Sequence, residues 1–178
     1  NNWEKAGELL KALADEEKTY ETMIEYAEFC EKQNRFKEAE AYCNNCLDIA
    51  DNDDDKATTL NNLAILYSNT QRLKESEKYF SEVLEIFRRL AMENPAAYEP
   101  DVAMTLNNLA ILYSDTQRLK ESEQYYIEAL EIYKRIAKEN PEAYKPDVAM
   151  TLNNLALLYK NTQRLKESEQ YYIEALEI

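Results

Sequence analysis

The sequence contains very few of the residues that proteins use to turn the chain. One glycine and four prolines occur in 178 residues. Because these residues dominate tight turns, a β-rich fold with many turns is excluded and long uninterrupted helices are favoured. Hydrophobic residues make up 45% of the chain, which is enough to build a core and argues against disorder.

Other absences restrict the function. No apolar run approaches the roughly 18 residues of a membrane-spanning helix, so no membrane partner is expected. No secretory signal pattern opens the chain. The chain begins at Asn1 without a methionine, which leaves a removed leader or a longer parent protein open. No nucleophile–base pair, phosphate-binding loop or distinctive carboxylate pair is found, so neither an enzyme nor a cofactor is expected.

Basic residues are also scarce. The chain carries 21 Lys and Arg against 35 Asp and Glu, a net charge of −14. Residues 1–56 hold 16 acids and 7 bases (−9), whereas residues 57–178 hold 19 and 14 (−5). Nucleic acid is therefore not expected, since phosphate binding needs clustered cations. A basic or neutral protein or peptide partner is favoured; the alternative is that the charge only keeps the chain soluble.

A repeat organises most of the sequence. TLNNLAILY occurs at residues 59–67 and 105–113 and returns as TLNNLALLY at 151–159, with a spacing of 46 residues each time. All four prolines lie in two equivalent linkers, ENPAAYEPDV and ENPEAYKPDV. Because proline lacks the donor that a helix interior needs, we predict that each linker breaks the helix.

Between the linkers the apolar residues have a helical period. Leu106, Leu109, Ala110 and Tyr113 share one face of a first helix. A break at 115–117 precedes a second helical pattern over about residues 118–138. A lone helical hairpin cannot cover its own apolar face, but stacked copies can. The sequence therefore predicts an all-α solenoid of stacked antiparallel helix pairs.

The repeat resembles the tetratricopeptide repeat family. The residues that carry this resemblance are Leu106, Leu109, Ala110 and Tyr113 on the first helix and Ser122, Tyr126 and Ala129 on the second, with their counterparts in the other copies. Alanine and serine replace the family glycine and alanine, and leucine replaces the family tryptophan. LNNLAILY and PDVAMTLNNLA are similar to the repeats of kinesin light chains and their bacterial relatives. The resemblance implies a right-handed superhelix.

Phasing against the repeat gives the expected boundaries. Residues 1–19 form a helix of a preceding repeat or a cap, 20–56 a divergent repeat, 57–102 and 103–148 full repeats, and 149–178 a truncated, uncapped repeat. Since terminal repeats normally need a polar capping face, we expect a fragment of a longer array and end-to-end self-association through its C-terminal end.

Two local motifs have alternative interpretations. Cys30, Cys43 and Cys46 include a C-x-x-C, but zinc normally needs four ligands and no histidine can complete the set. The cysteines coincide with inward repeat positions, which predicts small buried core residues and fits a reducing, cytoplasmic location.

DNDDD at residues 51–55 suggests a calcium loop, but Lys56 and Asn62 replace its required glycine and glutamate. We expect a solvated loop with helix-capping aspartates.

A second stripe on the first helix is the candidate binding site. The resemblance implies that this stripe, here called the groove stripe, faces the concave surface of the superhelix. Its members and the asparagines beside it are Asn61, Asn62, Ile65, Asn69, Met104, Asn107, Asn108, Ile111, Asp115, Met150, Asn153, Asn154, Leu157 and Asn161. An amide donates and accepts, so stacked asparagines can hold the backbone of an extended peptide. The alternative is that one asparagine of each pair bonds to the neighbouring helix and fixes the stacking.

The expected function is a non-catalytic protein-interaction scaffold that binds a peptide segment in its concave groove. The alternative is a structural spacer or oligomerisation segment of a larger signalling protein. A third reading is a regulatory segment of an enzyme whose catalytic domain lies outside these residues.

Overall fold

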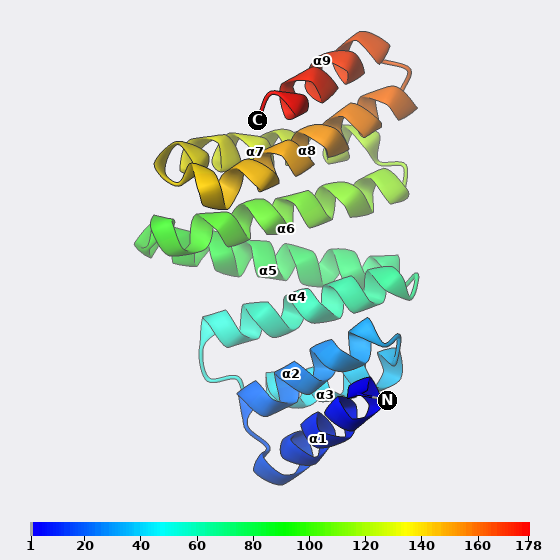
Figure 1. The fold of residues 1–178 in the computed structure, drawn as a ribbon, viewed down its shortest axis with the longest axis vertical. Coiled ribbons are helices and arrows are strands. Elements are labelled where there is room, and N and C mark those ends of the chain that lie inside the picture. Colours follow the sequence, from blue (N-terminus) through cyan, green and yellow to red (C-terminus); the bar gives the residue numbers. More distant parts are fainter. Residues whose placement is uncertain (1) are drawn as a thin grey trace. The chain divides into compact units, whose positions relative to one another are not determined.

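The computed structural model describes the backbone of residues 2–178 and the side chains of residues 3–178. Within this range every regular element is an α-helix (Figure 1), which confirms the predicted all-α class. The helices are α1 (Asn2–Glu17), α2 (Tyr20–Lys32), α3 (Phe36–Ile49), α4 (Asp53–Asn69), α5 (Leu73–Glu93), α6 (Pro95–Asp115), α7 (Leu119–Glu139), α8 (Pro141–Asn161) and α9 (Leu165–Leu176).

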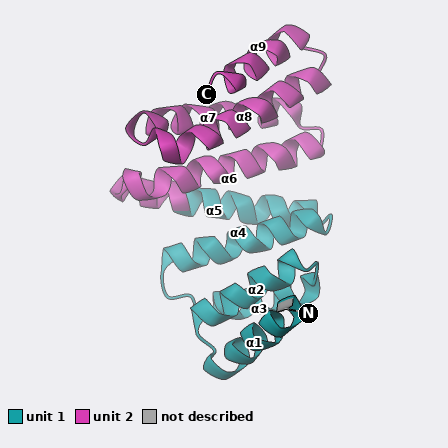
Figure 2. Ribbon diagram, in the orientation of Figure 1, with its two compact units in different colours: residues 1–86 teal, residues 87–178 magenta. Residues whose placement is uncertain are grey.

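Most helices pack against their neighbours in the chain. They divide into two compact units, residues 1–86 (unit 1) and 87–178 (unit 2), with the boundary inside α5 (Figure 2). In unit 1, α2 packs against α1 and α3, and α3 packs against α4. In unit 2, α7 packs against α6 and α8, and α8 packs against α9. Stacked helix pairs thus form the predicted solenoid within each unit.

The inward stripe of each first helix forms the core. Leu106, Leu109, Ala110 and Tyr113 are buried, as predicted, and so are their counterparts in the other two copies. Each leucine buried in this way contributes about 1.5–3 kcal/mol relative to an exposed one. On α7, the buried Ser122 hydroxyl donates to the carbonyl of Ala110 at 2.7 Å. Ser122 is small enough to let α6 and α7 pack closely. Its hydroxyl also makes a hydrogen bond that the family alanine at this position could not make.

A cluster of glutamate, tyrosine and arginine links successive helix pairs. In unit 2, Glu123 of α7 accepts hydrogen bonds from the Tyr159 hydroxyl at 2.8 Å and from Arg164 at 2.9 and 2.8 Å. The Arg164 guanidinium lies 4.1 Å from the centroid of the Tyr159 ring. Unit 1 repeats the arrangement with Glu40, Tyr67 and Arg72.

The prolines interrupt the chain less than predicted. The break is confined to Asn94 and Asn140, and Pro95 and Pro141 begin α6 and α8. Proline at the first helical position costs little, because its missing N–H would have no partner there. Pro100 and Pro146 lie inside these helices. The carbonyls that they leave unbonded belong to exposed residues four positions earlier, so water can replace the lost donor. The predicted break in each linker is therefore confirmed, but it is one residue long, and the rest of each linker is helical.

The turn inside each full helix pair has a glutamine in the left-handed region. Gln71, Gln117 and Gln163 have φ of 62°, 62° and 61°. After α6, the Arg118 N–H bonds to the Tyr113 carbonyl at 2.7 Å and the Gln117 N–H to the Ser114 carbonyl at 3.1 Å. These two bonds define a Schellman motif, whose left-handed residue is usually glycine. The near absence of glycine therefore does not prevent the tight turns of this fold.

Candidate functional site

The groove stripe of unit 2 combines exposed apolar side chains with half-buried amides. On α6, Met104 and Ile111 are 39% and 42% exposed, and on α8 their counterparts Met150 and Leu157 are 44% and 49% exposed. Asn108 and Asn154 lie between these apolar residues in each helix and are half-buried. The core cluster joins Ala103 and Ala110 of α6 to Leu152 and Leu155 of α8. The two copies of the stripe therefore belong to one packed body.

The first asparagine of each pair has different surroundings. Asn107 is only 3% exposed, and its Oδ1 has no hydrogen-bond partner among the described residues. Asn61 is half-buried, and its Oδ1 is likewise buried without a partner in that part of the chain. Asn153, at the same repeat position on α8, is exposed. Asn107 thus lies beneath the surface to which Asn108 contributes.

In unit 1 the groove stripe of α4 is held by glutamates of α2. The Asn62 amide donates to Glu28 at 3.5 Å, and the Asn69 amide donates to Glu31 at 3.1 Å. Ile65, between them on α4, is half-buried. Burial raises the pKa of Glu31 above its ordinary value, and the Asn69 hydrogen bond opposes this rise.

The divergent repeat has Ile24 and Glu25 where the next repeat has Asn61 and Asn62, and the glutamates around them were not predicted. A signal was available, since the divergent repeat is offset by 37 residues from the next one. This offset places Glu21 at the position of Met104 and Glu28 at the position of Ile111. The face of α2 is therefore acidic where the faces of α6 and α8 are apolar.

The last members of the stripe lie at helix ends. Asn69, Asp115 and Asn161 are the final residues of α4, α6 and α8, and all three are exposed. They are positioned beside the turns that carry the left-handed glutamines.

The cysteines are core residues, as predicted. Cys30, Cys43 and Cys46 are free thiols and are buried. Burial raises the pKa of both Cys43 and Cys46 to about 12. They are therefore protonated, weak nucleophiles at neutral pH.

The aspartate-rich segment begins a helix. Asn52, rather than an aspartate, caps α4, and its side chain accepts from the Asp55 N–H at 2.8 Å. The prediction of capping aspartates is corrected in this respect: Asp53, Asp54 and Asp55 occupy the first turn, where negative charge favours the helix dipole. Among the described residues, no group of three or more potential ligands is arranged to hold a metal ion. Nor is any described helix both long and apolar enough to cross a membrane.

Comparisons with known proteins agree with this architecture. The family profile described as Tetratricopeptide repeat matches residues 18–89 and 101–178. A search of curated proteins finds no match.

Several solved structures share the fold. BtubC (BKLC) from P. vanneervenii, a kinesin light chain-like protein, is 24% identical, with a TM-score of 0.76 over 99% of this chain and 70% of BtubC. RapI in its apo form is 19% identical, with a TM-score of 0.74 over 97% of this chain and 60% of RapI. PilF of Pseudomonas aeruginosa is 16% identical, with a TM-score of 0.70 over 99% of this chain and 68% of PilF.

The family profile covers most of the sequence, and the helix pairs, inward residues and solved structures agree with it. The chain belongs to the tetratricopeptide repeat family, whose members are in general scaffolds for protein interaction.

Proposed function

We propose that the chain binds an extended peptide segment of a partner protein across the groove stripes of α6 and α8. The observation that carries this proposal is the recurrence, in one unit, of two exposed apolar side chains around a half-buried asparagine. A core role does not explain why Met104, Ile111, Met150 and Leu157 keep 39–49% of their surface exposed. Exposed apolar groups with a polar group between them are typical of interaction surfaces.

The two asparagines of the α6 pair have different roles. Asn108 and Asn154 contact the peptide backbone, for which an amide supplies both a donor and an acceptor. Asn107 is too deeply buried to reach a ligand and instead supports the packing of α6. Met104, Ile111, Met150 and Leu157 contact apolar side chains of the peptide.

Unit 1 favours a basic segment of the partner. On α2, Glu21 and Glu25 are exposed and Glu28 and Glu31 are half-buried, and they share this helix with only one basic residue, Lys32. Residues 1–86 contain 20 acids and 10 bases, a net charge of −10. Such a field raises the association rate of a cationic ligand and weakens with added salt.

The test uses peptides selected from a random display library against the whole chain. Selected peptides are measured by fluorescence polarisation against the wild type and the Asn108→Ala/Asn154→Ala variant. Loss of two backbone contacts should weaken binding by about tenfold or more. The matched control is Asn44→Ala/Asn45→Ala, which removes two exposed asparagines from the second helix α3. Equal affinity of wild type and groove variant would contradict the proposal.

A second candidate function is self-association. On α9, Leu165, Ile173 and Leu176 are 59%, 49% and 88% exposed. We propose that this apolar surface packs on a second copy at high concentration. The apparent mass in light scattering should then rise with concentration and should rise less for Leu176→Lys. A constant monomer mass over a wide concentration range would exclude this role.

A further inference from the structure

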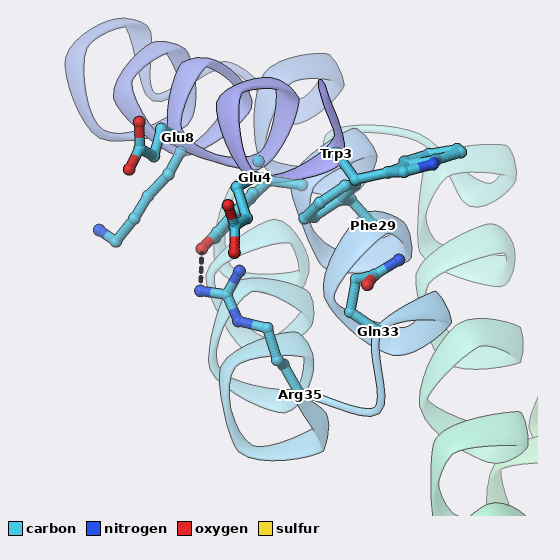
Figure 3. Close-up of a pocket in the computed structure, with 9 residues that line it drawn as sticks. Trp3, Glu4, Glu8, Phe29, Gln33 and Arg35 are labelled. Atoms are coloured by element: carbon cyan, nitrogen blue, oxygen red, sulfur yellow. Dashed lines mark hydrogen bonds between the residues drawn. The ribbon is translucent and has the colours of Figure 1, made fainter. Parts of the chain in front are cut away.

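A pocket between α1 and α2 lies apart from the groove stripe. Its volume is about 430 Å³. Figure 3 shows the residues that line it. The lining residues used below are Trp3, Gly7, Glu8, Tyr26, Phe29 and Arg35. None of the groove-stripe residues, and none of Glu21, Glu25 and Glu28 of α2, lines this pocket.

Two unusual residues lie at or near this pocket. Gly7 is the only glycine of the chain, and a Cβ at this position would lie 2.6 Å from the ring of Phe29. Glycine therefore lets Phe29 lie against the backbone of α1. Cys30 occupies the position where the later repeats place a tyrosine under the turn arginine, as Tyr67 does under Arg72. Arg35 instead bonds to the Tyr26 hydroxyl at 2.8 Å and lines the pocket.

Aromatic side chains form one wall of the pocket. Trp3 is 67% exposed and Phe29 is half-buried. Figure 3 shows these two side chains and Gln33 on one side and Glu8 on the other. The faces of aromatic rings attract cations, most strongly for tryptophan.

The cations of the lining are already paired. Arg35 donates to Glu38 at 2.9 and 2.5 Å, and Lys11 pairs with Asp15 at 2.5 Å. Neither Glu38 nor Asp15 lines the pocket. Their carboxylates offset the two positive charges from outside, so the pocket does not repel a further cation. Glu8 adds a negative charge on the wall opposite Trp3.

We infer that this pocket binds an arginine side chain of a partner protein. The planar guanidinium stacks on the aromatic wall of Trp3 and Phe29 and donates hydrogen bonds to the Glu8 carboxylate. The arginine methylenes contact the apolar surface of Phe29. The net charge of −10 over residues 1–86, from 20 acids and 10 bases, favours the approach of such a partner. This contact lies outside the groove and does not depend on peptide binding there.

Trp3 provides a direct measurement, because it is the only tryptophan of the chain. The whole chain is titrated with acetyl-Gly-Arg-Gly-amide and, in parallel, with the citrulline peptide, which has nearly the same shape but no charge. The arginine peptide should produce a saturable change in tryptophan fluorescence. The citrulline peptide should bind about fivefold more weakly, because it loses the cation–aromatic and ionic interactions.

Charge-neutralising variants locate the site. Glu8→Gln should weaken binding of the arginine peptide by about two- to fivefold. Glu16→Gln makes the same change at an exposed position of α1 outside the pocket and should leave the affinity unchanged. Circular dichroism checks that both variants remain folded. The inference is overturned by the absence of a saturable change, by equal binding of both peptides, or by equal effects of the two variants.

Discussion

At the scale of single residues, adjacent side chains of the same type have different roles. Asn107 and Asn108 are neighbours in a repeated motif, yet one is buried and the other lies at the surface. The helical period places Asn108 in the groove stripe and Asn107 beside it, but it does not show that Asn107 is buried. Burial of Asn107 depends on the packing of its surroundings, which a single helix pattern does not contain. By contrast, Leu109 was predictable as core, because only an apolar residue suits the centre of that stripe.

This difference predicts contrasting stability effects. Asn108→Ala and Asn154→Ala should each change the free energy of unfolding by only about ±0.5 kcal/mol, because they remove surface amides. Leu109→Ala should cost about 2–5 kcal/mol, because it leaves a cavity in the core. Urea denaturation followed by circular dichroism measures both effects. If the asparagine variants unfold the protein, these side chains have a packing role instead.

The left-handed glutamines lead to a second residue-scale prediction. Gln117→Gly should raise the free energy of unfolding by about 0.5–1 kcal/mol, because glycine adopts positive φ without the steric cost of a Cβ. Gln124→Gly, at an exposed position inside α7, should lower it by about 1 kcal/mol, because glycine disfavours a helix interior. Thermal melts of the two variants compare them directly. Shifts of the same sign in both would show that φ at Gln117 does not limit stability.

At the scale of helices and their contacts, the sequence pattern predicted where the helices lie better than it predicted their contacts. The apolar period located α7 within one residue at each end. The prolines predicted the position of each break but not its length, because a proline inside a helix is tolerated when the carbonyl four residues earlier can reach water. The glutamate–tyrosine–arginine clusters were not predicted, since their partners are more than 25 residues apart in the chain.

The cluster in unit 2 should couple α7 to the next helix pair. A double-mutant cycle with Glu123→Gln and Arg164→Gln should give an interaction energy of about 1 kcal/mol, modest because both side chains are partly exposed. Added salt should reduce it. The exposed pair Lys134 and Glu174 provides a comparison and should couple more weakly in the same kind of cycle. Additive effects at Glu123 and Arg164 would rule out a linking role.

The buried thiols of α3 should make stability depend on alkaline pH. Burial raises the pKa of Cys43 and Cys46 from 9.0 to about 12. Between these values the unfolded chain releases protons that the folded chain retains, so stability is complete below pH 9 and falls as the pH rises. The loss is at most about 1.4 kcal/mol per thiol per pH unit.

Cys43→Ala/Cys46→Ala removes this contribution and should flatten the fall in unfolding free energy above pH 9, although the baseline stability also drops. Urea titrations at several pH values compare the two slopes. Identical slopes would mean that the thiols do not ionise differently in the folded and unfolded chains.

At the scale of the whole molecule, the repeat period and its core residues were sufficient to predict the family. Solved structures with 24% identity or less still share the fold, because packing needs only small and large residues in phase. The candidate binding face was harder to predict, because its exposed positions do not determine the packing of the helices. The acidic face of α2 shows this, because glutamates replace the apolar positions there without disturbing the core.

The central claim is that a peptide lies on the groove stripes of α6 and α8, and the four methionines test it. Met104 and Met150 lie in the stripe, Met23 is buried in unit 1, and Met92 is 83% exposed on α5. Methionine-methyl NMR spectra of the whole chain should be recorded during titration with a library-selected peptide. The account predicts that the Met104 and Met150 signals shift with the bound fraction while those of Met23 and Met92 stay fixed. Shifts at Met92 or Met23 without shifts at Met104 and Met150 would contradict it.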